Sequence, residues 1–180
     1  MKKFLLSFLV LCSSFISCKA QSSWEKVSDS LAMVSRAKAD EVLMYFDTLK
    51  SSKLLYSILD KDYYVLVKDE EKKYKEYYIT TDSLGKITEV RFLERTKREN
   101  KELSQLNPFE LQKYCSGFIT KMPDAEYVRG PSSYFVVKDE SGERHGEFCL
   151  STFTLPIPID GKLYGYLVRR LSEQMSKSPN

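Results

Sequence analysis

Residues Asp62–Arg95 contain three runs of β-branched and aromatic residues, separated by the charged turn Asp69–Lys72 and by Asp82–Gly85, and this pattern predicts a three-stranded antiparallel meander. The strands are expected at Tyr63–Lys68, Tyr74–Thr80 and Lys86–Glu94. Gly85 follows the second strand, where a hairpin turn needs a residue that accepts positive φ. A sheet of this size is stable only when another layer covers one face, so we expect helices from the flanking sequence to pack against it.

The segment before this meander has a helical period. Ser22 and Glu25 form a capping-box pattern, so a helix should begin at about Ser23 or Trp24. Apolar residues then recur at three- and four-residue steps: Trp24, Val27, Leu31, Val34, Val42, Tyr45 and Leu49. The next stretch, Lys53–Leu59, carries two adjacent pairs of apolar residues and is interpreted as a short second helix or a final turn.

The residues after the meander suggest a change from loop to helix. Arg95–Glu102 is a run of mixed charge, which is typical of a solvated loop or the exposed face of a helix. Asn107 can cap a helix and Pro108 suits its first position. We therefore expect a second helix from Pro108 to about Lys121, ended by Pro123.

The last third of the chain is predicted to return to strands. Ser133–Lys138 and Arg144–Thr154 have strand composition, with a turn between them. Asp160-Gly161 lies between two apolar runs and is a strong hairpin signal. The last strand is then Leu163–Arg170, and a helix over Leu163–Met175 is the main alternative because the same residues also fit a helical period.

These elements define an α+β fold: an N-terminal helix, a three-stranded antiparallel meander, a second helix and a second antiparallel meander. This order would fit a duplicated α-β-β-β unit, although no repeat is visible at the level of residues. The chain has 180 residues, of which 42% are hydrophobic, enough to form the core of one domain. We expect that domain to span residues 21–175, followed by a flexible tail at 176–180.

The first twenty residues have the character of an export signal. Lys2 and Lys3 form a positive end, Phe4–Leu11 is apolar, and small residues follow. The apolar run is shorter than a bilayer-spanning helix requires, which favours a cleaved signal at 1–20.

The end of this signal, Phe15-Ile16-Ser17-Cys18, resembles the lipobox of bacterial lipoprotein precursors. That resemblance implies that Cys18 becomes the lipidated first residue of a membrane-anchored protein. Phe15 departs from the family, which most often has leucine there. Two alternatives stay open, namely soluble secretion after cleavage at Ala20 and an uncleaved anchor.

Removal of an export signal would lower the net charge, which is formally +3 for the whole sequence. Without Lys2 and Lys3 the chain carries 26 basic and 25 acidic residues. That balance gives no electrostatic basis for binding nucleic acid. The partners expected are therefore an envelope protein or a small ligand, with the membrane reached through the lipid.

Two of the four cysteines, Cys115 and Cys149, lie in the mature domain. An even pair in an oxidising compartment is typical of a disulfide, which by its loop length would contribute about 3–4 kcal/mol. The alternative is two buried thiols that never meet.

Catalytic and metal-binding patterns are weak in this chain. His145, the one histidine, is four residues before Cys149, a spacing of roughly 13 Å along a strand and too far for direct activation. One histidine and two cysteines make no tetrahedral metal set, and phosphate-binding glycine loops are absent. We expect no cofactor and no metal, but carboxylates brought together only by the fold could still serve a hydrolase.

Tyrosines gather around the first meander. Among them Tyr64, Tyr74 and Tyr78 are candidates for an exposed binding surface, because tyrosine provides large contact area at low entropic cost. Ordinary packing within a sheet is the other interpretation.

The order of elements resembles the PepSY-like and β-lactamase-inhibitor-like modules that bacteria export, which bind other proteins. Ile159–Gly165 also resembles a turn in extracytoplasmic PAS-like sensor domains. We therefore expect an exported binding module without a catalytic site. The alternatives are an extracytoplasmic hydrolase and a structural subunit of an envelope assembly.

Overall fold

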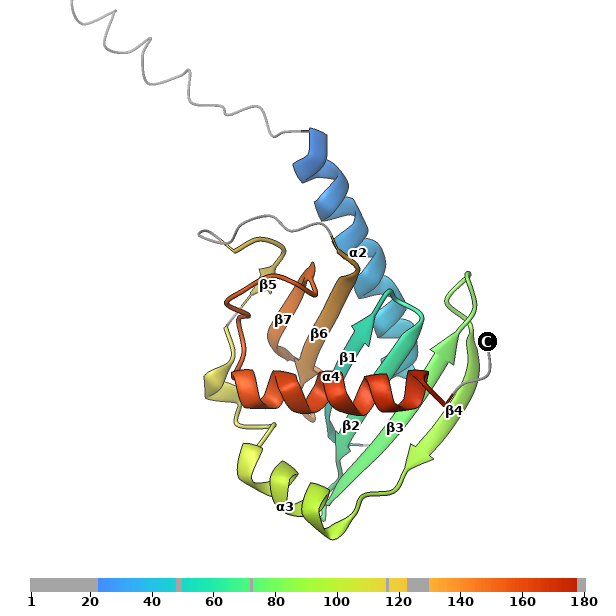
Figure 1. Ribbon diagram of the computed structural model, residues 1–180, viewed down its shortest axis with the longest axis vertical. Helices are drawn as coiled ribbons and strands as arrows, with labels where there is room; N and C mark the ends of the chain where they lie inside the picture. Colours follow the sequence, from blue (N-terminus) through green and yellow to red (C-terminus); the bar gives the residue numbers. More distant parts are fainter. Residues whose placement is uncertain (1–22, 48–49, 72, 116, 123–129, 178–180) are drawn as a thin grey trace, which may run out of the picture.

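The computed structural model describes residues 23–47, 50–71, 73–115, 117–122 and 130–177, shown in Figure 1. In this part of the chain, helices cover both faces of one seven-stranded mixed sheet, so the α+β class is confirmed. The predicted export signal at 1–20 lies outside the described residues.

The strands of the sheet, in chain order, are β1 (Ser52–Ile58), β2 (Asp62–Lys68), β3 (Tyr74–Thr81), β4 (Ile87–Leu93), β5 (Phe118–Ile119), β6 (Ser132–Lys138) and β7 (Arg144–Ser151). Their order across the sheet is β4-β3-β2-β1-β6-β7-β5. Neighbouring strands are antiparallel, apart from β5, which pairs with β7 in parallel. The edges are therefore a full-length strand, β4, and a two-residue strand, β5.

The predicted meander is confirmed in β2, β3 and β4, but it is preceded by a further strand. The helix or turn predicted at Lys53–Leu59 is wrong, because these residues form β1 at the centre of the sheet. Leu54 and Tyr56 are buried on one face and Leu55 on the other. A central strand covered on both faces is apolar at successive positions, which hides the period of two.

Helix α2 (Ser23–Met44) covers one face of the sheet. It confirms the predicted N-terminal helix and ends before the predicted limit of Leu49. Side chains at three- and four-residue steps are buried against the sheet: Ala32, Ser35, Ala39, Val42, Leu43 and, just beyond the helix, Phe46. We call the apolar layer that they form with Leu55, Tyr63, Val65, Val67, Ile79, Tyr134, Val136 and Cys149 the α2-side cluster.

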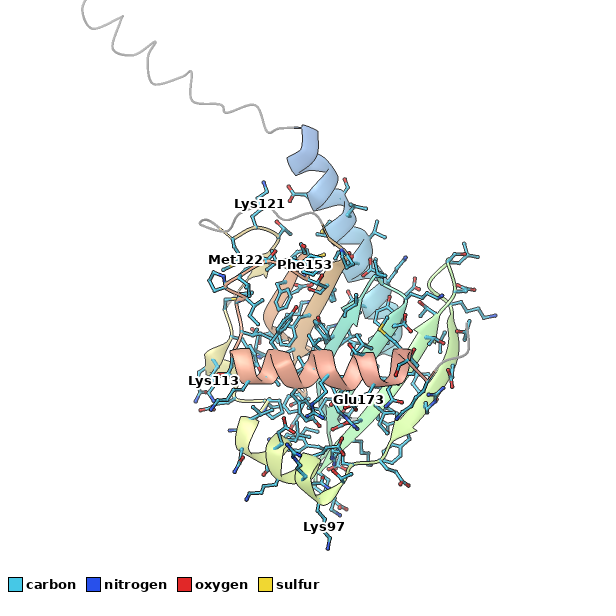
Figure 2. The ribbon with its side chains drawn as sticks, in the orientation of Figure 1. Lys97, Lys113, Lys121, Met122, Phe153 and Glu173 are labelled. Atoms are coloured by element: carbon cyan, nitrogen blue, oxygen red, sulfur yellow. The ribbon has the colours of Figure 1, made fainter. Side chains whose placement is uncertain are left out.

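The opposite face is covered by α3 (Lys97–Leu106) and α4 (Gly161–Met175), with the short 3-10 helix η1 (Leu111–Lys113) beside them. Figure 1 shows α4 crossing in front of the strands while α2 lies behind them. Side chains fill the space between α4 and the sheet, whereas the labelled Lys97, Lys113 and Lys121 point away from the body of the protein (Figure 2).

The helix predicted at Pro108–Lys121 is wrong, and α3 forms instead within the mixed-charge run. Thr96 and Glu99 make a reciprocal capping box at its start. At its end Asn107 is left-handed, with φ 44°, and its N–H donates to the carbonyl of Leu103. Pro108 therefore follows a helix C-terminus, where proline is common because it cannot continue a helix.

The last strand predicted at Leu163–Arg170 is also wrong, and the helical alternative is confirmed as α4. Asp160 is the N-cap rather than a hairpin residue, since its Oδ1 accepts from the N–H groups of Lys162 and Leu163, each at 3.0 Å. The strands predicted at Ser133–Lys138 and Arg144–Thr154 are confirmed as β6 and β7. Four strands between α2 and α3 do not form a duplicated α-β-β-β unit.

Within the described part of the chain, no helix has both the length and the apolar character needed to span a bilayer.

Candidate functional site

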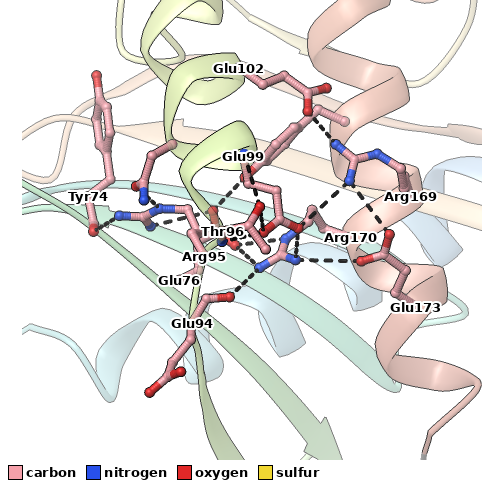
Figure 3. Close-up of polar contacts among 12 residues, drawn as sticks. Tyr74, Glu76, Glu94, Arg95, Thr96, Glu99, Glu102, Arg169, Arg170 and Glu173 are labelled. Carbon is pink, nitrogen blue, oxygen red and sulfur yellow. Dashed lines mark hydrogen bonds and ion pairs between the residues drawn. The ribbon is translucent and has the colours of Figure 1, made fainter.

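A buried ion pair joins the sheet to the last helix (Figure 3). Glu76 of β3 is completely buried, and its Oε2 accepts from Nε and Nη2 of Arg170 on α4 at 2.9 and 2.6 Å. Its Oε1 accepts from the Tyr166 hydroxyl at 2.6 Å. Both oxygens of the carboxylate are therefore satisfied, as burial of a charge requires.

More charges surround this pair and tie α3 to α4. Arg170 also donates to Glu99 at 2.6 Å, and Arg169 donates to Glu102 at 2.7 Å. From the loop after β4, Arg95 donates to the backbone carbonyl of Tyr74 at 2.6 Å. The whole group lies where β3, α3 and α4 meet (Figure 3).

The electrostatics of this group are those of a structural network. Burial by itself would raise the pKa of Glu99, but hydrogen bonds from Thr96 and the charges of Arg170 and Arg169 outweigh it and lower that pKa. A general acid for hydrolysis needs the opposite shift. The carboxylates and arginines of this group therefore join β3, α3 and α4 to one another.

A second polar network binds α2 to the other half of the sheet. Glu147 of β7 is buried and accepts from the Tyr134 hydroxyl and from Arg36 of α2 at 3.0 Å. Asp40, one turn further along α2, accepts from Lys138 at 2.8 Å and from Arg144 at 2.6 Å. Among the described residues, the buried carboxylates of Glu76 and Glu147 are thus both paired with arginine.

His145 lies at the β6–β7 turn, where it contacts Asp139 and not Cys149. Its Nε2 is 2.7 Å from Asp139 Oδ2, and Glu143 is close enough for the three to offer ligand atoms within 4.8 Å of one another. The other oxygen of Asp139 accepts from Ser141 and from the Glu143 N–H, as in an Asx turn. Turn formation therefore accounts for the grouping.

The tyrosines predicted as a binding surface do not form one. Tyr64 and Tyr78 are completely buried beneath α4, and Tyr74 is half-buried with its ring stacked 6.0 Å from that of Phe109. Alternation along a strand assigns residues to two faces, but it does not show which face a helix will cover. The three side chains belong to the core on the α4 side.

The predicted disulfide is not present in the structure, where Cys115 and Cys149 are both unbonded thiols. Cys149 lies in the α2-side cluster on β7, and burial raises the pKa of its thiol to about 11 although Ser35 hydrogen-bonds to it. Cys115 follows η1 and is half-buried. The lipidation site predicted at Cys18 lies outside the described residues.

The best candidate site is a row of aromatic rings on the α2 side of the sheet. The rings are Tyr45, Phe46, Tyr77 and Phe92, and their centroids follow one another at 5.1, 4.9 and 5.7 Å. We call these four residues the aromatic row. It runs from the end of α2 across β3 to the edge strand β4.

The two ends of the aromatic row are open to solvent, since Tyr45 is 57% exposed and Phe92 is 56% exposed. Between them Phe46 is buried and Tyr77 is half-buried, so the row is anchored in the core. Rings held in place by contacts with neighbouring rings need little ordering when they bind.

Helix α2 ends at Met44, directly before the aromatic row, and its two flanks reach different parts of the sheet. Arg36 and Asp40 on one flank of α2 reach β6 and β7. On its opposite flank Lys38 and Glu41 approach Gly85 in the β3–β4 turn. Val34 precedes Lys38 by one turn and is also exposed.

Part of the aromatic row could be predicted from the sequence. The spacing of Val90 and Phe92 places them on one face of β4, and pairing with β3 puts Phe92 opposite Tyr77. What it lacked was the position of α2, because lateral placement of a helix on a sheet depends on contacts that are far apart in the sequence.

No protein-family model, no curated protein and no solved structure matches this chain. The candidate site therefore rests on its own geometry.

Proposed function

We propose that this protein is an exported, lipid-anchored binding module of the bacterial envelope that captures a partner protein through the aromatic row. The observation that supports the proposal is the exposure of Tyr45 and Phe92 at the two ends of a row whose middle is buried. Aromatic side chains fixed in this way are the usual anchors of protein–protein interfaces.

The partner chemistry follows from the shape of the surface. The row lies along a sheet and a helix end and is flanked by mixed charges, such as Lys38 and Glu41 of α2. Such a surface suits an apolar segment of another protein better than a small ligand, which needs an enclosed site to bury most of its area. We therefore favour a protein partner.

The interior chemistry supports binding over hydrolysis. Glu76 and Glu147 are held by arginines, and the pKa of Glu99 is lowered. A hydrolase would need a carboxyl group with a raised pKa facing its substrate.

The membrane anchor is supported by the signal pattern that ends at Cys18. It can be tested by the mass of the mature protein purified from bacterial membranes. We expect a diacylated or triacylated chain beginning at Cys18, and an unmodified product for Cys18→Ala. A soluble wild-type product beginning at Gln21 would contradict the anchor.

The binding surface can be tested by capture from envelope extract, with variants at both ends of the aromatic row. Tyr45→Ser and Phe92→Ser should each lower the amount of the captured protein at least about tenfold, because hot-spot aromatics typically contribute 2 kcal/mol or more. Leu155→Ser is the matched control, since Leu155 is 73% exposed but lies in the connection between β7 and α4. Equal capture by all four proteins would overturn the proposal.

A further inference from the structure

We propose that an apolar tip of the protein, defined by Leu31, Leu59, Phe153 and Leu155, rests in the headgroup region of the bilayer that carries the lipid anchor. The inference deepens the proposed function, because it rests on the anchor at Cys18. It concerns a different surface from the aromatic row and has its own test.

The four side chains of the apolar tip are large and open to solvent, since each is between 58% and 73% exposed. They come from three separate segments: helix α2, the β1–β2 turn and the connection between β7 and α4. Exposed apolar side chains that gather from separate segments mark a surface that binds another apolar surface.

The β1–β2 turn places Leu59 beside α2. The next residue, Asp60, accepts a hydrogen bond from the Ser35 hydroxyl of α2 at 2.6 Å. The carbonyl oxygen of Leu31, one helical turn nearer the start of α2, lies 3.1 Å from the same hydroxyl. Leu31 and Leu59 therefore lie on adjacent segments at the same end of the sheet.

Strand β7 ends beside the same turn. The N–H of Leu59 donates to the carbonyl of Ser132 at the start of β6 at 3.0 Å, and Ser132 is opposite Ser151 at the end of β7. Neighbouring strands are about 4.8 Å apart, so the end of β7 lies about 10 Å from Leu59. Phe153 and Leu155 follow shortly after and complete the apolar tip; Figure 2 labels Phe153 at this end of the sheet.

Leu59 combines an exposed side chain with an unfavourable backbone conformation. Its φ is 62°, in the left-handed region that glycine and asparagine adopt most readily. A leucine held in this region costs folding free energy, and an exposed side chain recovers none of it through packing. Contact with the apolar part of a bilayer supplies the compensation.

The charges of the described residues around the apolar tip suit a bilayer surface. The carboxylate of Asp29 accepts a hydrogen bond from Thr120 at 3.2 Å, and that of Asp60 is held by α2 as described above. Lys61 and Lys121 are exposed. Lysines beside an apolar surface are attracted to anionic lipid headgroups.

The proposed anchor leaves little room for any other partner at this end. Ser23, the first residue of α2, is five positions after Cys18, a distance of at most about 17 Å in an extended chain. The helix from Ser23 to Leu31 adds about 12 Å. These lengths sum to about 29 Å, whereas a domain of 100 residues is about 34 Å across. The bilayer is therefore the surface within reach.

This orientation keeps the aromatic row available to a partner protein. Met44, the last residue of α2, lies about 20 Å along the helix from Leu31. The aromatic row begins at the next residue, Tyr45, and so lies at the end of α2 that is farther from the bilayer.

Spin labels measure how deep the apolar tip lies. The lipidated full-length chain is purified from bacterial membranes and reconstituted into vesicles of phosphatidylethanolamine and phosphatidylglycerol. Labels on Leu59→Cys and Leu155→Cys, each combined with Cys115→Ser, should lie about 5–10 Å into the boundary between headgroups and acyl chains. Collisions with oxygen and with a water-soluble nickel complex report this depth. A label on Met44→Cys, a similarly exposed apolar residue, should stay in water.

Removal of the apolar side chains should lift the apolar tip off the bilayer. The double variant Phe153→Ser/Leu155→Ser should move the label on Leu59→Cys into water, because it removes half of the apolar contact. Met44→Ser is the matched control and should leave the depth of that label unchanged. Circular dichroism checks that each variant is folded.

The backbone conformation of Leu59 can be tested without a bilayer. Asparagine adopts positive φ more readily than leucine, so Leu59→Asn should raise the urea midpoint of unfolding in detergent. The same substitution should reduce the depth of the label on Leu155→Cys in vesicles. A lower midpoint would overturn the proposal, because leucine would then serve the fold and not the bilayer contact.

The apolar tip and the anchor can fail separately. A lipidated chain whose labels on Leu59→Cys and Leu155→Cys are as accessible to water as that on Met44→Cys would overturn the tip alone. A mature protein without lipid would overturn both. Labels that leave water only when envelope extract is added would assign the apolar tip to a protein partner and overturn the bilayer contact.

Discussion

Nε and Nη2 of Arg170 both donate to the same oxygen of Glu76, Oε2, at 2.9 and 2.6 Å. The second oxygen, Oε1, accepts from the hydroxyl of Tyr166 at 2.6 Å and from Nη1 of Arg95 at 3.5 Å. A glutamate in the middle of a strand and an arginine near the end of the chain are thus joined in the interior. This contact, rather than apolar packing alone, fixes α4 on the sheet.

Breaking this ion pair should destabilise the protein severely. We expect Arg170→Met to lower the free energy of unfolding by about 3 kcal/mol, because it leaves the buried Glu76 carboxylate with only the more distant Arg95, whose Nη1 is 3.5 Å from Oε1. Urea unfolding followed by circular dichroism measures the change. Arg169→Met is the matched control: its side chain is 38% exposed, so it should lose less than about 1 kcal/mol. Similar losses in both variants would contradict this role for Arg170.

The double variant Glu76→Leu/Arg170→Met separates the charge from the packing. With both charged groups gone, neither is left uncompensated, so it should be more stable than Arg170→Met alone. The same urea titration gives the comparison. A double variant less stable than Arg170→Met would show that the attraction itself, and not the avoidance of a lone charge, dominates.

Acid should weaken the β6–β7 turn. Burial by itself would raise the pKa of Asp139, but hydrogen bonds from Ser141 and His145 outweigh it and lower that pKa to about 2. A carboxyl group whose pKa is lower in the folded state stabilises the protein above its unfolded pKa of 3.8 and stops doing so as the pH falls toward 2. We expect the free energy of unfolding to decline over this window.

Asp139→Asn should be less stable than the wild type at pH 7 and should show a smaller decline between about pH 4 and pH 2. Urea titrations at a series of pH values provide both quantities. Glu140→Gln removes a charge from the exposed residue next in the turn and serves as the control. If the two variants have the same pH dependence, the hydrogen bonds of Asp139 are not its source.

The thiol of Cys149 should be inert in the folded protein. Burial raises its pKa to about 11, so only about one molecule in a thousand carries the thiolate at pH 8. We expect iodoacetamide to modify Cys149 in urea but not under native conditions, as seen by peptide mass spectrometry. Cys115, which is half-buried, provides the internal comparison. A Cys115–Cys149 peptide that appears only without reductant would contradict the unbonded state.

The N-cap of α4 should contribute measurably to stability. Asp160→Ala removes the acceptor for the N–H groups of Lys162 and Leu163 and should lower the free energy of unfolding by about 1 kcal/mol. Asp160→Asn keeps an acceptor oxygen and should recover most of that loss. Thermal or urea unfolding checks both. Equal loss in the two variants would indicate a role for the charge and not for the cap.

Local patterns in the sequence were sufficient where runs of strand-forming residues lie between clear turn signals. Strands β2, β3, β4, β6 and β7 follow from β-branched and aromatic residues and from turn residues such as Gly85. Helix α2 follows from its apolar stripe. Burial in β2, β6 and β7 is continuous on both faces, so composition and turns identified these strands, and not a period of two.

Local patterns failed where two interpretations fit the same residues. In strand β1 the adjacent apolar pairs Leu54-Leu55 and Ile58-Leu59 also fit a short helix. Helix α4 has an apolar stripe at Leu163, Tyr166, Leu167 and Leu171, but the Asp160-Gly161 pair before it favoured a hairpin. Arg170 can be buried because it pairs with Glu76. The two residues are 94 positions apart in the sequence, so no short window contains both.

Asn107 and Asp160 show a different kind of failure. Both residue types favour the first and the last turns of helices as well as tight turns, because their short side chains hydrogen-bond to nearby backbone groups. Asn107 ends a helix with φ 44°, and Asp160 begins one where a hairpin was expected. The residue indicates a boundary, and tertiary packing decides what lies on each side of it.

The placement of the Arg170 guanidinium in the final helix ties completion of the fold to the arrival of the carboxyl-terminal segment. A nascent polypeptide that stops before α4 holds a glutamate that cannot be desolvated alone, so its sheet should stay loose and remain a substrate for proteases. Compaction of the sheet then waits until α4 has been synthesised. Truncated translation products should accordingly be cleared and not accumulate.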